Sequence, residues 1–187
     1  MAETKLDSER IWDSHKQSQF HLGITKQPIQ IKKSSFEDVS DFNSQFGVLQ
    51  LNKPNLDDTT FIDSRMALIR EEMRELEEAV KDKDIVETVD ALTDILYVVY
   101  GMGYSLNVNL DKAFDNVHES NMSKICLTEE DAKKTVEWYK NNETRYKTPA
   151  YRINKAGNFV VYDVDTRKIL KSIHYKPASL REISLGK

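Results

Sequence analysis

Four acidic residues come in two pairs, and the members of each pair are three positions apart. Glu72 and Glu75 lie in one predicted helix, and Glu87 and Asp90 lie in the next. The short KDKD segment between the helices makes them antiparallel neighbours, so the two pairs face each other. Carboxylates in this arrangement form a ring of hard oxygen ligands that suits Mg²⁺ or Mn²⁺. We therefore expect one or two divalent ions here, with Mg²⁺ as the cofactor and Mn²⁺ as a substitute.

Further acids lie beside these pairs. Asp94 follows Asp90 by one helical turn and shares a stripe with Glu87 on a strongly apolar helix. A buried acid needs a cationic partner, because burial of an unpaired charge is strongly unfavourable. Glu71 is the candidate general base, although it could equally lie on the solvated face of its helix. A structural ion-pair network among the acids is the alternative interpretation.

Five helices are predicted to position these groups, because apolar residues recur at helical spacing between capping and breaking residues. They span about 35–46, 60–80, 84–102, 109–124 and 128–142. The third is apolar around most of its circumference, so we expect it to be central and its acids to be buried.

After Pro149 the apolar residues alternate. This pattern predicts two strands, NFVVYDV and KILKSIHY, joined by DTRK, and PASLREI could add a closing helical turn. The predicted fold class is all-α, a bundle of four to five helices with an acidic metal-binding face, plus a small C-terminal β-hairpin. The expected domains are an N-terminal arm (1–33), a helical domain (34–143) and the hairpin extension (144–187).

Composition excludes some classes of function. The 187 residues include 27 Lys and Arg against 31 Asp and Glu, a net charge of −4, which argues against nonspecific binding of nucleic acid. The single cysteine, Cys126, has no disulfide partner within the chain, which fits a reducing compartment, and core packing is its expected role. No apolar run is long enough for a membrane span or a signal peptide. We therefore expect a cytoplasmic protein without a membrane or nucleic-acid partner.

Longer stretches of the sequence resemble one family. EEMREL, followed by ETVD, DILYVVYG and VHESNMSK, resembles the all-α nucleoside triphosphate pyrophosphohydrolases, which include MazG, dimeric dUTPases and phosphoribosyl-ATP pyrophosphohydrolase. The resemblance runs from about Val39 to about Lys124, and the tail YDVDTRKILKSIHYKPASL is similar to extensions of some members. The spacing between the two acid pairs is at the short end of the family's range. The resemblance implies that magnesium is bound by Glu72, Glu75, Glu87 and Asp90.

The resemblance also implies the reaction, hydrolysis of a nucleoside triphosphate to the monophosphate and pyrophosphate. The preferred base and sugar stay open, with dUTP and non-standard nucleotides among the candidates. Asn121 lies seven residues after Phe114 on an apolar stripe, so we expect its amide to point inward and to hydrogen-bond a base. The candidate substrate-binding residues are Asp94, His118, Asn121 and Lys124.

Two of these candidates have a simpler interpretation. Lys124 would meet a phosphate, or it could instead stabilise the end of its helix through the helix dipole. His118 could be an ordinary surface histidine.

The apolar faces of the helices exceed what four or five short helices can cover. This excess predicts a homodimer or a dimer of dimers, and the resemblance implies the same.

Two other classes of protein are alternatives. A non-catalytic binding or assembly module would use the acids to hold a structural ion, and it would show no turnover. A carboxylate-bridged di-iron bundle would want Glu-x-x-His on two helices, a pattern that does not occur here. Only Asp115 and His118 have a similar spacing.

Overall fold

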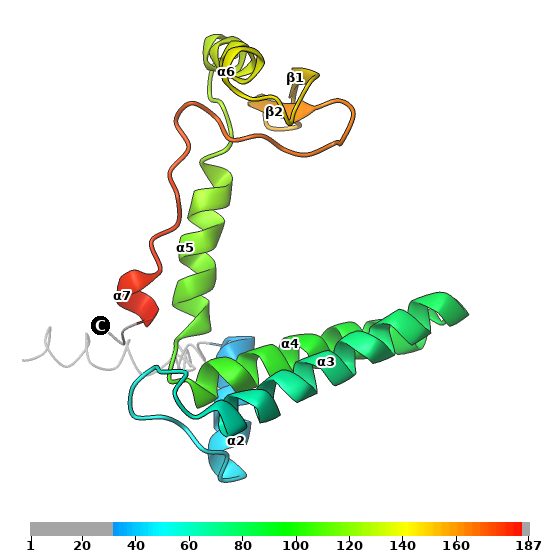
Figure 1. Ribbon diagram of the computed structural model, residues 1–187, viewed down its shortest axis with the longest axis vertical. Helices are drawn as coiled ribbons and strands as arrows, with labels where there is room; N and C mark the ends of the chain where they lie inside the picture. Colours follow the sequence, from blue (N-terminus) through cyan, green and yellow to red (C-terminus); the bar gives the residue numbers. More distant parts are fainter. Residues whose placement is uncertain (1–31, 185–187) are drawn as a thin grey trace, which may run out of the picture. The chain divides into compact units, whose positions relative to one another are not determined.

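The computed structural model describes residues 32–184, so the predicted arm over 1–33 lies outside the described residues except for its last two. The compact unit described below begins at Ser34. Between residues 32 and 184 the chain forms six α-helices and one two-stranded sheet (Figure 1). The predicted fold class, all-α with a small C-terminal β-hairpin, is confirmed. The elements are α2 (Ser35–Gln45), α3 (Thr59–Asp82), α4 (Ile85–Ser105), α5 (Leu110–Met122), α6 (Glu129–Asn142), β1 (Pro149–Ile153), β2 (Phe159–Asp163) and α7 (Arg181–Ser184).

Side-chain caps set where the helices begin. Ser34 and Glu37 form a reciprocal capping box at α2. The Asp84 carboxylate accepts hydrogen bonds from two backbone N–H groups in the first turn of α4. At α6 the Thr128 hydroxyl accepts from the backbone N–H of Asp131, as the sequence predicts. Each cap satisfies N–H groups that a helix leaves without an internal partner.

The longest helices between residues 32 and 184, α3 and α4, pack against each other and are joined by only two residues. Lys83 ends α3 in the left-handed conformation, with φ at 58°, and Asp84 caps α4 immediately afterwards. This tight reversal brings the end of α3 next to the beginning of α4. The two acid pairs therefore belong to helices that pack against each other.

Aromatic side chains join α2 to α4. The rings of Phe36 and Tyr100 meet edge to face with their centroids 6.0 Å apart, and those of Phe42 and Tyr97 at 5.5 Å. Gly103 allows the close approach at the end of α4, because a Cβ there would lie 2.5 Å from the Leu110 side chain. These contacts anchor one end of the α3–α4 pair.

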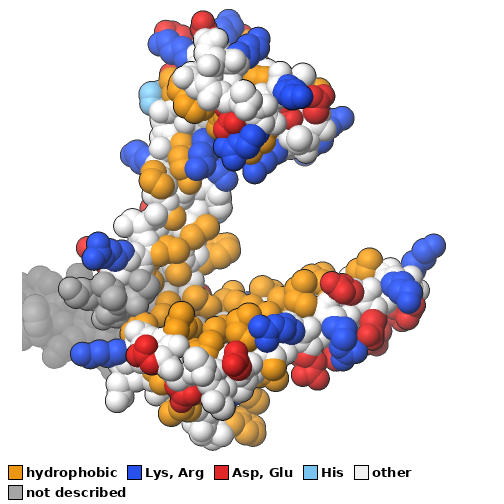
Figure 2. All heavy atoms as spheres, in the orientation of Figure 1, with side chains coloured by type: hydrophobic (Ala, Val, Ile, Leu, Met, Phe, Trp, Pro, Cys, Tyr) orange, Lys and Arg blue, Asp and Glu red, His pale blue; other side chains and the backbone are white. Residues whose placement is uncertain are grey.

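The prediction that α4 is central and buried is wrong for the single chain. Its buried residues are only Ala91, Gly101, Gly103 and Ser105. The physical reason is that α3 and α2, its main neighbours, cover part of its circumference and leave the rest uncovered. Figure 2 shows the resulting band of hydrophobic side chains along this helix. The large hydrophobic residues exposed on α3 and α4 are Leu68, Met73, Val80, Ile85, Val86, Val89, Leu92, Leu96 and Tyr97.

The C-terminal hairpin has a different pairing from the predicted one. β2 pairs antiparallel with β1, which precedes it, and Pro149 lies opposite Asp163 in this register. Asn154 and Gly157 shape the connecting turn, with Gly157 at φ 82°. The predicted strand KILKSIHY forms only an isolated bridge, Tyr162 with Ile169. The chain does reverse at DTRK, but the following segment then inserts its leucine into the core instead of extending the sheet.

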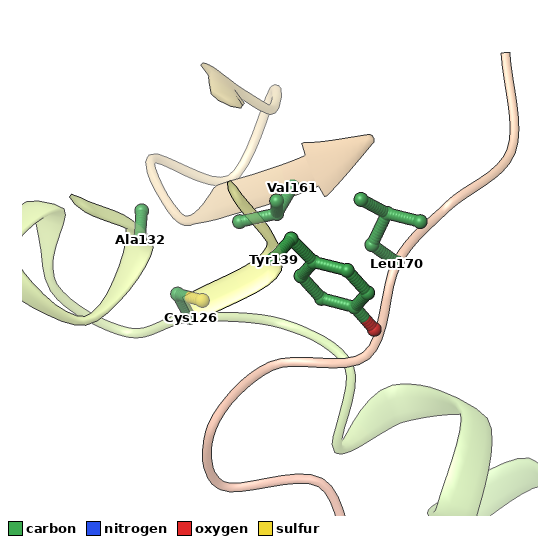
Figure 3. Close-up of a cluster of buried hydrophobic side chains, with 5 residues drawn as sticks. All are labelled: Cys126, Ala132, Tyr139, Val161 and Leu170. Atoms are coloured by element: carbon green, nitrogen blue, oxygen red, sulfur yellow. The ribbon is translucent and has the colours of Figure 1, made fainter. Parts of the chain in front are cut away.

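That core lies between α6 and the hairpin, and Figure 3 shows its five buried side chains, Cys126, Ala132, Tyr139, Val161 and Leu170. Cys126 is fully buried, with its sulfur 3.7 Å from the Thr135 hydroxyl, so its expected packing role is confirmed. Burial raises the pKa of its thiol. We call α6, β1, β2 and the segment up to residue 176 the C-terminal module.

The end of the C-terminal module is bound to α5. The Ser120 hydroxyl donates a hydrogen bond to the Tyr175 hydroxyl at 3.1 Å. The Ser172 hydroxyl donates to the backbone oxygen of Ser123 at 2.9 Å. None of the helices between residues 32 and 184 is long and apolar enough to cross a membrane.

Candidate functional site

The predicted acids gather where α3 faces α4, with Glu72 among them. Burial raises the pKa of Glu72, and the neighbouring charges of Glu75, Asp94, Glu71 and Asp90 raise it further. One carboxylate oxygen of Glu72, Oε2, is buried and has no hydrogen-bond partner. Buried carboxylate oxygens are normally paired, so this orphaned oxygen indicates a place where a cation would be favourable.

Glu87 lies at the other end of the acidic group, beside Glu75. The two residues line a hollow of about 360 Å³ at the junction of α3 and α4. Arg74 lines the same hollow, and its guanidinium forms ion pairs on α3 with Glu78 at 2.9 Å and with Glu75 at 4.0 Å. The positive charge of Arg74 is thus already neutralised within its own helix, and the hollow keeps an excess of carboxylates.

The exposure of the acids differs from the prediction of a buried stripe. Glu75, Glu87 and Asp90 are exposed, whereas Glu72 and Asp94 are half-buried. Among residues 32–184, no three Asp, Glu, His or Cys side chains converge closely enough to hold a metal ion. The acids lie open for the same reason as the apolar band on α4, because no element between residues 32 and 184 covers that side.

The donor chemistry of the site nevertheless fits a hard divalent cation. Its side chains offer carboxylate oxygens from two rigid helices, and one of these oxygens, on Glu72, is buried without a partner. Mg²⁺ prefers such ligands and keeps several waters, so it does not require a closed cage of protein groups.

The raised pKa of Glu72 leads to a prediction about stability. The folded protein holds the Glu72 proton more tightly than the unfolded chain does, so the free energy of unfolding falls as pH rises from the ordinary value of 4.5 through the raised pKa. Without divalent metal at pH 7.5, Glu72→Gln should therefore raise Tm by about 1–4 °C. The difference should vanish below pH 4, where the glutamate is protonated in both states.

Thermal unfolding followed by circular dichroism measures this effect, with Glu77→Gln on the exposed face of α3 as the matched control. An equal Tm for wild type and Glu72→Gln at pH 7.5 would contradict the proposed crowding of charges.

Two predicted substrate-binding residues come together at the end of α5. The Lys124 ammonium donates a hydrogen bond to the Asn121 amide oxygen at 2.7 Å. Asn121 is exposed, so the expectation that its amide points inward is wrong. The reason is that the apolar stripe of α5 is itself uncovered, with Phe114 68% exposed.

The other two candidates lie in different surroundings. His118 is exposed, and its ring lies parallel to that of Phe114 with centroids 6.2 Å apart. Asp94 belongs to the acid cluster through its charge interaction with Glu72.

Arg65 was not among the residues predicted from the sequence. Its Nε is buried without a hydrogen-bond partner, and its guanidinium lies over the Phe61 ring at 5.8 Å. Its spacing of seven residues before Glu72 is the signal that could have identified it, because residues two turns apart share a helix face.

Comparison with known proteins finds a similarity for part of the helical region. The family model of phosphoribosyl-ATP pyrophosphohydrolase matches residues 39–121. The resemblance to the all-α nucleoside triphosphate pyrophosphohydrolases is confirmed for this segment. We call residues 39–121 the matched segment; it covers less than half of the chain. An uncharacterized protein of Acanthamoeba polyphaga mimivirus is 28% identical to this chain over 237 aligned positions, which cover 78% of this chain and 93% of that protein.

The matched segment contains both acid pairs and ends at Asn121. Lys124 and the C-terminal module lie beyond it. The match therefore supports a nucleotide pyrophosphohydrolase type of function for the helices that carry the acids, and it gives no role to the C-terminal module.

Proposed function

We propose that the protein is a Mg²⁺-dependent hydrolase that converts nucleoside triphosphates or their deoxy forms to the monophosphate and pyrophosphate. The observation that carries this proposal is that the matched segment contains two acid pairs on facing helices. The buried oxygen of Glu72, which lacks a partner, supports it independently of the family match. A purely solvated acidic surface would leave no such oxygen.

The residues that would hold the metal are Glu72, Glu75, Glu87 and Asp90. Bound Mg²⁺ would neutralise phosphate charge and lower the pKa of a water molecule. The requirement for a cation follows from charge, because a triphosphate would otherwise be repelled by the cluster.

Glu71 is the proposed general base. It is exposed and adjacent in sequence to Glu72, so its carboxylate is free to accept a proton from a water molecule. The oxygen of that water bonds to the α-phosphorus while the bond from the α-phosphorus to the bridging oxygen breaks. Pyrophosphate leaves with that bridging oxygen, and the nucleoside monophosphate remains.

Asn121 and Lys124 are proposed to contact the substrate, and kinetics separate this role from helix capping. Lys124→Ala should raise KM or lower kcat, while the free energy of unfolding changes by only about 0.3–1 kcal/mol, the size of a lost contact with the helix dipole. Asn121→Ala should change the ranking among dUTP, dCTP and dATP, because an amide that reads a base edge discriminates between bases. If both variants keep the wild-type KM and the same ranking of substrates, Asn121 and Lys124 have a structural role only.

The test of the proposed function is pyrophosphate release from a panel of substrates with Mg²⁺. The panel should contain the four NTPs, the dNTPs including dUTP, and phosphoribosyl-ATP, since the matching family model bears that name. Turnover of at least one substrate, abolished by EDTA, is the expected result. Binding of nucleotide without any turnover would favour the non-catalytic module instead.

We also propose that the active form is a homodimer or a dimer of dimers. The exposed apolar band of α3 and α4 supports this proposal, because soluble monomers rarely expose so many adjacent large hydrophobic side chains. A second copy of the chain has the same band, so the two surfaces match in chemistry and can bury each other. Such packing would also lower the exposure of Asp90 and Glu87, which lie on the same helix.

A further inference from the structure

The C-terminal module has a charge opposite to that of the whole chain. The module, residues 129–176, contains eleven Lys and Arg against seven Asp and Glu, whereas the full sequence has a net charge of −4, and the excess comes from residues 143–176, with eight Lys and Arg and three Asp and Glu. One of the three acids in residues 143–176, Asp163, is buried and accepts hydrogen bonds from Thr148 and Thr166. The surface of this module is therefore more basic than its composition suggests, and Figure 2 shows Lys and Arg side chains gathered on it.

Two adjoining hollows open in this basic surface. One, of about 440 Å³, lies between α6 and residues 171–175, and the other, of about 390 Å³, lies between α6 and residues 168–171. They share three lining residues, Trp138, Tyr139 and Lys171. Trp138 is 49% exposed, and its ring meets the Tyr139 ring edge to face with their centroids 5.0 Å apart. It therefore presents a fixed aromatic surface at the boundary between the hollows.

Three lysines at the second hollow have no carboxylate partner among the described residues. Lys124, Lys168 and Lys171 line this hollow, and none of them forms an ion pair with any residue between 32 and 184. Lys168 lies over the Tyr146 ring at 5.4 Å and Lys171 over the Tyr175 ring at 4.4 Å, so aromatic contacts position both ammonium groups.

Among the described residues that line this hollow, Glu143 carries the one carboxylate, and this carboxylate already forms an ion pair with Arg145. The Arg145 guanidinium donates to both of its oxygens at 3.0 Å. This pairing lowers the pKa of Glu143 to about 2, so its negative charge persists and is balanced by Arg145 at neutral pH. The positive charges of the three lysines are left uncompensated.

We propose that these hollows form a second nucleotide-binding site, in which a base stacks on Trp138 and the phosphate chain lies along Lys168 and Lys171, two lysines that the proposed hydrolysis does not use. An exposed tryptophan accepts any base by stacking, and clustered ammonium groups attract phosphate oxygens. The combined hollows have the size of small-molecule pockets, which favours a free nucleotide over a polymer that would extend beyond them. The site goes beyond the proposed hydrolysis, because it contains none of the acids of α3 and α4.

Binding without metal tests this site separately from the proposed function. The W12F variant leaves Trp138 as the only tryptophan of the chain, which has two. Titration of this protein with ATP in EDTA, followed by tryptophan fluorescence excited at 295 nm, should show saturable quenching. In the same background, Lys168→Ala with Lys171→Ala should weaken ATP binding at least tenfold. Glu72→Gln should leave it unchanged, because the acidic site requires Mg²⁺ to hold a triphosphate.

The matched control is Lys155→Ala, since Lys155 lies in the hairpin turn of the same basic module and lines neither hollow. Calorimetry with Trp138→Leu in EDTA should also show about tenfold weaker binding, the loss expected for one stacked base. Two results would contradict a nucleotide site and indicate a general attraction for anions. One is an equal loss of ATP affinity in Lys155→Ala. The other is inorganic triphosphate that binds as tightly as ATP. A ten-nucleotide oligo(dT) that binds far more tightly than ATP would overturn the assignment in favour of single-stranded nucleic acid.

Discussion

Pyrophosphate release is expected to fall by about 100-fold or more when any one of the four acids on α3 and α4 loses its charge. The variants are Glu72→Gln, Glu75→Gln, Glu87→Gln and Asp90→Asn. Each keeps the size of the side chain but removes a negative charge that would hold Mg²⁺. The loss should appear in kcat/KM at saturating Mg²⁺, measured with the best substrate of the panel.

Thermal unfolding distinguishes a lost metal site from a damaged fold. Mg²⁺ should raise the Tm of the wild type, because an ion that binds only the folded state stabilises it. The acid variants should unfold at or above the metal-free wild-type Tm but respond weakly to added Mg²⁺. Glu77→Gln, on the exposed face of α3, should behave like the wild type in both assays. Near-normal turnover in all four acid variants would exclude the metal site as assigned.

The helices could be predicted from the sequence because their signals are local. Asp84 and Thr128 cap α4 and α6 through hydrogen bonds to N–H groups two or three residues away. The tight reversal at Lys83 likewise depends on a few neighbouring residues. Such interactions join residues that are close in sequence, so the approximate bounds of these helices followed from spacing alone.

The errors arose where a partner from elsewhere in the chain decides the outcome. β2 has an alternating pattern, which allows it to pair with strands on either side, and pairing with β1 leaves Leu170 free to enter the core. The exposure of Asp90 depends on what covers α4, and the sequence of one helix does not specify its neighbours. The basic hollow around Trp138 was missed for a similar reason, because its lysines come from segments far apart in the chain.

The uncovered face of α4 gives the second large expected effect. Val89→Glu combined with Leu96→Glu should convert the wild-type dimer, or dimer of dimers, to a monomer at micromolar concentration. Both side chains are 56% exposed in the single chain, so the charges should not disturb its own packing. If each is buried between copies, its loss removes about 1.5 kcal/mol, and the four such side chains in a dimer weaken association by about 10⁴-fold.

Light scattering should give a mass of two or four times the 21.7 kDa chain for the wild type and the mass of one chain for the double variant. Ile153→Glu is the matched control, since Ile153 is 64% exposed on β1, outside the α3–α4 face. It should leave the mass unchanged, because an exposed aliphatic side chain contributes to association only where a second copy covers it. A wild-type protein that scatters as a monomer, with full activity, would contradict the dimer. The apolar band of α4 would then have to be covered by a different partner.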